Sequence, residues 1–314
     1  METRSRLFLA ATGAAVLFLL VQLGALLLVE PFIDAGYQAV EDPSDPRNTV
    51  VYLVAILVMT GFILAVIRFD LEQVLRGLVI AMSTLLAWYV TSVAVPLLLG
   101  PAIGPVLPAA LAVLVGVALY VHPEWYVIDT AGVLIGAGGA GLFGISFGPL
   151  PAILLLGVLA VYDAISVYGT EHMLTLAESV TDLKLPLVLV IPLSRDYSFR
   201  ADTAVGGEGE SPEDREAFFI GLGDAVMPSI LVASAAVFLD VPSFGLTGLA
   251  FNLPALTAMV GTLAGLGALL WFVAKGRAHA GLPLLNGGAI AGYLIGAIAA
   301  GVTLVEALGL APYV

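Results

Sequence analysis

The chain of 314 residues carries too little charge for an ordinary soluble domain. Its residues are 60% hydrophobic and only 11% charged, whereas soluble domains carry about twice that charged fraction. The absence of cysteine excludes disulfides, thiol nucleophiles and cysteine-bound metals, and three histidines are too few to suggest a multi-histidine metal centre. The net charge of −13 argues against nucleic acid as a partner. We therefore expect a protein that resides in a lipid bilayer.

Nine apolar stretches follow one another along the chain. A transmembrane helix needs about 20 mostly apolar residues. The stretches that meet or approach that length are Leu7–Val29, Val50–Ile67, Gly77–Leu99, Pro105–Val121, Val127–Phe147, Leu150–Gly169, Phe218–Leu239, Gly248–Val273 and Leu282–Val305. The first is too long for the core of a typical signal peptide, so we count it as a helix. The predicted fold class is an all-α membrane protein with nine transmembrane helices.

The lysines and arginines set the expected orientation of these helices. If the N-terminus lies inside, ten of the eleven basic residues also fall inside, as the positive-inside rule requires. They are Arg4, Arg6, Arg68, Arg76, Lys184, Arg195, Arg200, Arg215, Lys275 and Arg277, whereas Arg47 falls outside. The pattern predicts an N-terminus inside and a C-terminus outside.

One long polar loop divides the chain. We expect a six-helix part over residues 1–170, a flexible cytoplasmic loop over 171–217 and a three-helix part over 218–314. Residues 206–214 are acidic and contain three glycines, a composition typical of mobile segments. The apolar segment Leu183–Leu193 is too short to span a membrane, so it is either a strand or an interfacial segment.

Three acidic residues lie within the predicted spans. Asp129 is close enough to a helix end to reach the interface, so we expect a structural role for it. Asp163 lies six residues before the inner end of its helix, and Asp224 lies six residues after the inner start of the next one. Both carboxyl groups would therefore lie about 9 Å below the inner surface. A charge inside the membrane is costly, so a buried acid is a candidate functional residue.

Two carboxyl groups at one depth can perform acid–base chemistry. Neighbouring carboxyl groups cannot both ionise easily, so the pair keeps one proton. The ionised member can then draw a proton from water while the protonated member polarises a peptide carbonyl. A structural alternative stays open, in which the two aspartates pair or each bonds a neighbour such as Tyr162 or Ser166.

The residues around the two aspartates form a pair of motifs. Tyr162-Asp163 lies in one helix, and Gly221-Leu222-Gly223-Asp224 opens the next one after the long loop. Glycines just before an acid allow another backbone to approach it closely. With these motifs in nine helices, the chain resembles the presenilin and signal-peptide-peptidase family of intramembrane aspartyl proteases, most closely the archaeal homologues.

The resemblance implies roles for these residues. Asp163 and Asp224 would be the catalytic pair, Leu222 would face the substrate, and Tyr162, Gly221 and Gly223 would shape the site. The substrates would be transmembrane proteins or signal-peptide-like segments in the bilayer of the cell membrane. The ends of the long loop would help to hold the unwound substrate. Neither a metal nor an organic cofactor is implied, nor a partner subunit, and a homo-oligomer is left open.

The family also has a Pro-Ala-Leu motif at the start of its ninth helix, and here the chain departs from the pattern. A literal match, Pro254-Ala255-Leu256, falls in the outer part of the eighth predicted helix. The ninth helix instead begins on the inner side with Gly281-Leu282-Pro283, at about the depth of the two aspartates. We therefore expect residues 281–283 to shape the site.

Two other functions remain open at this stage. A proton- or sodium-coupled transporter also uses paired membrane aspartates, usually near the midplane between inverted repeats, but no internal repeat is evident here. A prepilin-type leader peptidase shares the Gly-x-Gly-Asp motif. The Tyr-Asp pair before the long loop favours the presenilin-like function over both alternatives.

Overall fold

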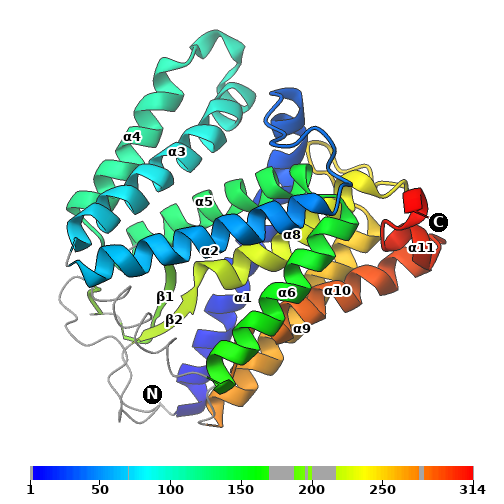
Figure 1. The fold of residues 1–314 in the computed structure, drawn as a ribbon. Helices are drawn as coiled ribbons and strands as arrows, with labels where there is room; N and C mark the ends of the chain where they lie inside the picture. Colours follow the sequence, from blue (N-terminus) through cyan, green and yellow to red (C-terminus); the bar gives the residue numbers. More distant parts are fainter. Residues whose placement is uncertain are drawn as a thin grey trace. The chain divides into compact units, whose positions relative to one another are not determined.

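The computed structural model describes residues 3–69, 71–169, 187–194, 197–199, 217–275 and 279–313. Helices dominate this part of the chain, and one small sheet accompanies them (Figure 1). In chain order the long elements are α1 (Thr3–Asp34), α2 (Arg47–Arg68), α3 (Glu72–Leu99), α4 (Val106–Val121), α5 (Trp125–Ser146), α6 (Pro149–Gly169), β1 (Val188–Pro192), β2 (Ala217–Gly221), α8 (Leu222–Phe238), α9 (Leu253–Ala274) and α10 (Gly281–Ala299). The short elements are η1 (Pro101–Ile103), α11 (Leu304–Ala307) and η2 (Ala311–Tyr313).

The lengths of the helices fit a multi-pass membrane protein. Seven helices in the described part are long and apolar enough to cross a membrane, and α4 and α8 are shorter apolar helices. The expectation of a mostly helical membrane protein is therefore confirmed. Most of the loop predicted to be flexible, residues 171–217, lies outside the described residues.

The structure corrects the start of the helix expected over Phe218–Leu239. Residues Ala217–Gly221 form strand β2, and α8 begins at Leu222. Aromatic and β-branched residues such as Phe218, Phe219 and Ile220 favour a strand, but a short apolar run does not distinguish a strand from a buried helix. As a result, Asp224 lies in the first turn of α8 rather than well inside it.

The helix expected over Gly248–Val273 also begins later, at Leu253. Asn252 is its N-cap, and the Asn252 side chain accepts a hydrogen bond from the Ala255 amide at 3.0 Å. Asparagine is among the favoured N-cap residues because its oxygen satisfies a free amide of the first turn. The capping residue thus fixes the start of α9.

The chain forms two compact units. Unit 1 comprises residues 1–17, 55–135 and 171–222, and unit 2 comprises residues 18–54, 136–170 and 223–314. Asp163, Asp224 and the segment 281–283 all belong to unit 2. The sheet and Asp129 belong to unit 1.

Unit 1 contains the antiparallel sheet. Val188–Pro192 pairs with Ala217–Gly221, and Val190 lies opposite Phe219. One face of the sheet joins a core with the end of α4 and the first turns of α5, formed by Leu119, Ile128, Ala131, Val190, Tyr197, Phe199 and Ala217. Of the two expectations for residues 183–193, the strand is therefore the one observed over Val188–Pro192.

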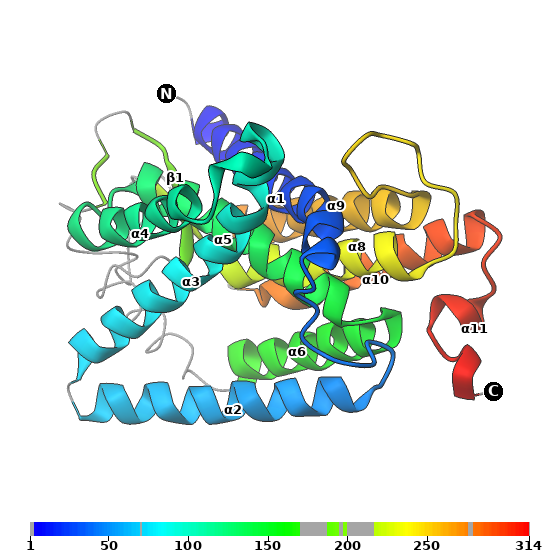
Figure 2. The ribbon, with the colours of Figure 1, turned by 90° about the horizontal axis from the view of Figure 1, so that it is seen from above.

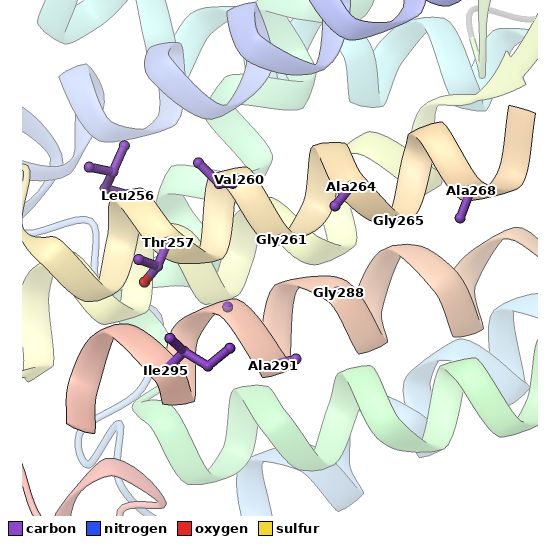
Figure 3. A pocket seen from close by; sticks show the side chains of 11 residues that line it. Leu256, Thr257, Val260, Gly261, Ala264, Gly265, Ala268, Gly288, Ala291 and Ile295 are labelled. Carbon is purple, nitrogen blue, oxygen red and sulfur yellow. The ribbon is translucent and has the colours of Figure 1, made fainter. Parts of the chain in front are cut away.

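Glycines control the packing of α9 on α10 in unit 2. A Cβ atom at Gly288 would collide with the carbonyl of Gly261, and one at Gly292 would collide with the carbonyl of Thr257. Figure 3 shows the two backbones side by side, with an apolar groove of about 610 Å³ along their contact. Small residues at membrane interfaces allow such close approach.

The C-terminal segment folds back on α10 after that helix ends. The Tyr293 hydroxyl of α10, which is fully buried, donates a hydrogen bond to the Ala307 carbonyl of α11 at 2.6 Å. Figure 2 shows α11 beyond the end of α10, next to the C-terminus. This bond ties the last described residues to unit 2.

The α9–α10 contact can be tested with two neighbouring glycines. We expect Gly288→Ala to lower the free energy of unfolding by about 1–3 kcal/mol, because the added methyl group forces the helices apart. Gly287→Ala is the matched control, because a Cβ atom there meets nothing within 4 Å. It should be neutral or slightly stabilising, since alanine favours a helix more than glycine does. Thermal unfolding in detergent measures both, and equal stabilities would contradict the packing argument.

Candidate active site

Helix α6 carries Asp163 to the start of α10. Asp163 is only 8% exposed, and its Oδ2 atom accepts a hydrogen bond from the Leu282 amide at 3.0 Å. Helices α6 and α10 pack against each other in unit 2, as Figure 1 shows. The carboxylate is therefore held against a backbone segment more than a hundred residues away in the chain.

The start of α10 needs such an acceptor. The first amides of a helix have no partner within the helix, and here the N-cap residue Ala280 offers no side-chain acceptor. Pro283 has no amide hydrogen to satisfy, which suits the first turn of a helix. Asp163 thus caps α10 from another helix, and the positive end of the helix dipole favours its negative charge.

Asp224 reaches the same segment from α8. Asp224 is partly exposed, and a Cβ atom at Gly281 would lie 3.4 Å from its Oδ2 atom, in van der Waals contact. Asp163 and Asp224 are also close enough to interact electrostatically. Two carboxyl groups from different helices therefore meet one two-residue segment, Gly281–Leu282.

Pro228 loosens the backbone around Asp224. In a regular helix the residue four positions later would donate its amide to the Asp224 carbonyl, but proline has no amide hydrogen. The first turn of α8 therefore lacks one of its ordinary hydrogen bonds at the residue that carries the carboxyl group.

Tyr168 and His279 also contact this region, although neither was predicted to be a site residue from its place in the sequence. The Tyr168 hydroxyl accepts a bond from the Ala280 amide at 3.4 Å. The His279 ring stacks on Phe272 with centroids 4.2 Å apart and meets the edge of the Tyr168 ring. An aromatic residue near the end of α6 was the only sequence signal for this contact.

Asn286 makes a second bond between α6 and α10. The Asn286 side chain is fully buried and donates from Nδ2 to the Leu156 carbonyl at 3.0 Å. Asn286 lies one helical turn after Leu282, and Leu156 lies about two turns before Asp163. The two bonds hold the helices in one register at the level of the carboxyl groups.

The remaining predicted residues take different positions. Tyr162 is 52% exposed, and within the described chain no hydrogen bond joins its side chain to either carboxyl group. Gly221 ends β2 and is exposed, and Gly223 is exposed with open space around it. Leu222 is only 9% exposed, and its Cδ1 atom would lie 3.8 Å from a Cβ atom at Gly132 of α5.

The literal Pro254-Ala255-Leu256 match lies far from this segment. Helices α9 and α10 are antiparallel, because Gly265 meets Leu284 whereas Pro254 meets Gly296. Gly296 is fourteen residues after Leu282, which corresponds to about 21 Å along a helix. Pro254 therefore packs against the opposite end of α10, while Leu282 and Pro283 occupy the turn that meets Asp163.

This arrangement offers a specific chemistry. Two adjacent carboxyl groups that share a proton can act together as a general base and a general acid. The nearby amides at the start of α10 hold one of them in place. Such a site can activate water for attack on a carbonyl group.

Comparison with protein families gives one match that spans most of the chain. Residues 15–302 match the family described as signal-peptide peptidase, presenilin aspartyl protease. The match includes every residue of the candidate site. A search of curated proteins found no match.

Solved structures give a similar result. Two crystal forms of a presenilin family intramembrane aspartate protease, in space groups C222 and P2, are each 38% identical to this chain and cover 92% of it. The chain covers 99% and 97% of those structures, with TM-scores of 0.69 and 0.66. The similarity therefore extends over nearly the full length of both proteins.

Proposed function

The chain belongs to the signal-peptide-peptidase and presenilin family and is an intramembrane aspartyl protease, and we propose that Asp163 and Asp224 are its catalytic pair. The prediction of this activity from the sequence is confirmed. One observation carries the assignment of the pair: both carboxyl groups lie at the segment Gly281–Leu282, where Asp163 accepts the Leu282 amide and the Asp224 Oδ2 atom lies 3.4 Å from the place that a Cβ atom on Gly281 would take.

The proposed reaction is hydrolysis of a peptide bond by water. The ionised carboxylate takes a proton from water, whose oxygen attacks the peptide carbonyl carbon. The protonated carboxyl group meanwhile donates to the carbonyl oxygen. The tetrahedral intermediate then collapses, the carbon–nitrogen bond breaks, and the leaving amine takes a proton from the pair.

The antiparallel sheet is the proposed holder of the unwound substrate. A transmembrane helix hides its peptide bonds in its own hydrogen bonds, so it must unwind before water can attack. An unwound segment can regain partners by adding to the edge of a sheet. Strand β2 runs directly into α8, which carries Asp224. A substrate strand paired with β2 would therefore be bound by residues that lie only a few positions before Asp224 in the sequence.

We propose nine spans, with the N-terminus inside and the C-terminus outside, in the cell membrane. Helices α4 and α8 have 16 and 17 residues, or about 24 and 26 Å, which approaches the hydrocarbon thickness of about 30 Å. The distribution of basic residues supports this orientation. The six-helix part, residues 1–170, would supply Asp163, and the three-helix part, residues 218–314, would supply Asp224.

The proposed substrates are transmembrane segments or signal-peptide-like segments within the bilayer. An acidic chain with a net charge of −13 is a poor partner for nucleic acid. We further propose that the chain acts without accessory subunits, as a monomer or homo-oligomer. The family match favours proteolysis over an ion-coupled transporter or a prepilin-type peptidase.

The catalytic pair can be tested by removing one acid at a time. We expect Asp163→Asn and Asp224→Asn each to lower cleavage of a transmembrane substrate at least about a hundredfold, because an amide cannot carry out the proton transfers. Asp240→Asn, at an exposed aspartate beyond the end of α8, is the matched control. Product analysis by mass spectrometry, with thermal unfolding as a check of folding, measures the effect. Substantial cleavage by either site variant would reject the pair.

The roles of residues 281–283 and of residues 254–256 can be distinguished by mutation. We expect Leu282→Ala and Pro283→Ala to lower kcat/KM about tenfold or more, because they disturb the turn that holds Asp163. Pro254→Ala should lower thermal stability but leave kcat/KM near the wild-type value, because Pro254 packs at the other end of α10. The reverse pattern, in variants of equal folded content, would assign the role to residues 254–256.

Strand addition predicts a two-residue periodicity in the substrate. Only alternate amides of an added strand face β2. We expect single N-methyl groups, moved one residue at a time along the substrate backbone, to lower cleavage about tenfold at alternate positions. Kinetics with a matched series of synthetic substrates measures this. If N-methylation lowered cleavage equally at every substrate position, the result would argue against a paired strand.

A further inference from the structure

The backbone groups of β1 point in two directions. In an antiparallel pair, successive residues direct their amide and carbonyl groups alternately toward the partner strand and away from it. The Leu222 amide donates to the Leu187 carbonyl at 2.8 Å, so Leu189 and Ile191 also face β2. Val188 and Val190 therefore direct their amides to the outer edge of β1.

Asp129 of α5 occupies this outer edge. Its Oδ1 atom accepts a hydrogen bond from the Val190 amide at 2.7 Å, and its side chain is only 9% exposed. A strand that added here would need the Val190 amide for one of its own carbonyl groups. It would also bring its carbonyl oxygens against a buried carboxylate, which is one way in which proteins block strand edges.

Further contacts hold the start of α5 against the β1 segment. The carboxylate of Glu124, just before α5, accepts bonds from the Ser198 hydroxyl at 2.9 Å and the Phe199 amide at 3.1 Å. A Cβ atom at Gly132 would lie 3.0 Å from a methyl carbon of Leu189. The start of α5 therefore meets Leu189 and Val190 of β1, and it also bonds residues 198 and 199, which follow β1 in the chain.

The outer edge of β2 is different. The alternation places the backbone groups of Ala217, Phe219 and Gly221 on that edge, and nothing in the described part of the chain forms a hydrogen bond with them. Gly221 is exposed. The described sheet thus has one edge that is occupied and one that is open.

We propose that Asp129 is a positioning residue that occupies the outer edge of β1 and so directs an unwound substrate segment to β2. This inference rests on the proposed function, in which the sheet holds the substrate. The choice of edge matters because only β2 continues into the helix that carries Asp224. Asp129 does not touch the reacting atoms in this role and acts through β1.

The hydrogen bond is tested first by amide exchange, which needs no activity. We expect Asp129→Ala to remove protection of the Val190 amide and to lower kcat and KM together by about tenfold, the factor for loss of one bond to a charged group, because a substrate segment bound at β1 is held unproductively. Asp129→Asn keeps an acceptor oxygen and should restore most of the protection and most of both kinetic constants. Thr130→Ala is the control, because its exposed hydroxyl bonds only the Tyr126 carbonyl of its own helix.

Val190→Pro removes the donor rather than the acceptor. An outward-facing strand position can accommodate proline, but an added strand would find no amide there, so Val190→Pro should leave kcat and KM near the wild-type values and should restore both when it is combined with Asp129→Ala. Unchanged kcat and KM in folded Asp129→Ala protein would overturn the proposal, as would equal losses in the asparagine and alanine variants or a double variant that Val190→Pro does not restore. If the alanine variant fails to fold, the cross-links of the protein that keeps Asp129 test the same edge.

The edge itself can be mapped by disulfide cross-linking, because the chain has no cysteine. Ile191 and Phe218 are directly opposite each other, one in each strand. A single-cysteine substrate bound at β2 lies within disulfide reach of Phe218→Cys but about 10 Å from Ile191→Cys, which is too far. We expect a cross-link only with Phe218→Cys, and a new one with Ile191→Cys when Asp129→Ala is added. A cross-link with Ile191→Cys in the presence of Asp129, or an unchanged pattern without it, would overturn the proposal.

These outcomes separate the two proposals. Failure of the proposed function appears as normal cleavage by Asp163→Asn or Asp224→Asn. Failure of the present inference appears as an active wild-type protein whose amide protection, KM and cross-links do not respond to Asp129→Ala.

Discussion

The hydrogen bond between the Leu282 amide and the Asp163 carboxylate organises unit 2. The first turn of α10 has unpaired amides and no side-chain cap of its own, while α6 carries a carboxylate that needs donors inside a membrane. Each group satisfies the other. The Asp224 carboxyl group lies beside the adjacent Gly281, 3.4 Å from the place that a Cβ atom there would take, so the second carboxyl group lies at the same turn. Both carboxyl groups therefore lie at the first turn of α10.

The packing of α10 against α9 and α6 holds its first turn in place. Gly288 and Gly292 allow α9 to approach α10 until backbone meets backbone, and Asn286 adds a buried bond to α6. In a bilayer the hydrophobic effect does not drive helices together, so close packing and interhelical hydrogen bonds must do so. The same packing places the literal Pro254-Ala255-Leu256 match at the opposite end of α10 from Leu282, because the two helices are antiparallel.

Unit 1 uses carboxylates for a different purpose. Asp129 and Glu124 both accept backbone amides from the segment that contains β1 or follows it, and they hold this segment against α5. A carboxylate that accepts a backbone amide can orient a strand without taking part in proton transfer. The three acids in the spans therefore divide into one that positions a strand and two that meet at the start of α10.

The sequence alone determined the class of protein and its mostly helical fold, and it singled out the two acids of the proposed site, because hydrophobic length and the cost of a buried charge are local properties. It did not determine where α8 begins, since Phe218, Phe219 and Ile220 are equally apolar in a strand and a helix. Nor did it reveal the partners of the acids. Asp163 and Leu282 are 119 residues apart, and Asp129 and Val190 are 61 apart. Only the tertiary structure decided these pairings. Nearly every residue has a backbone amide, so the sequence does not indicate which amide will lie next to the carboxylate in the folded protein.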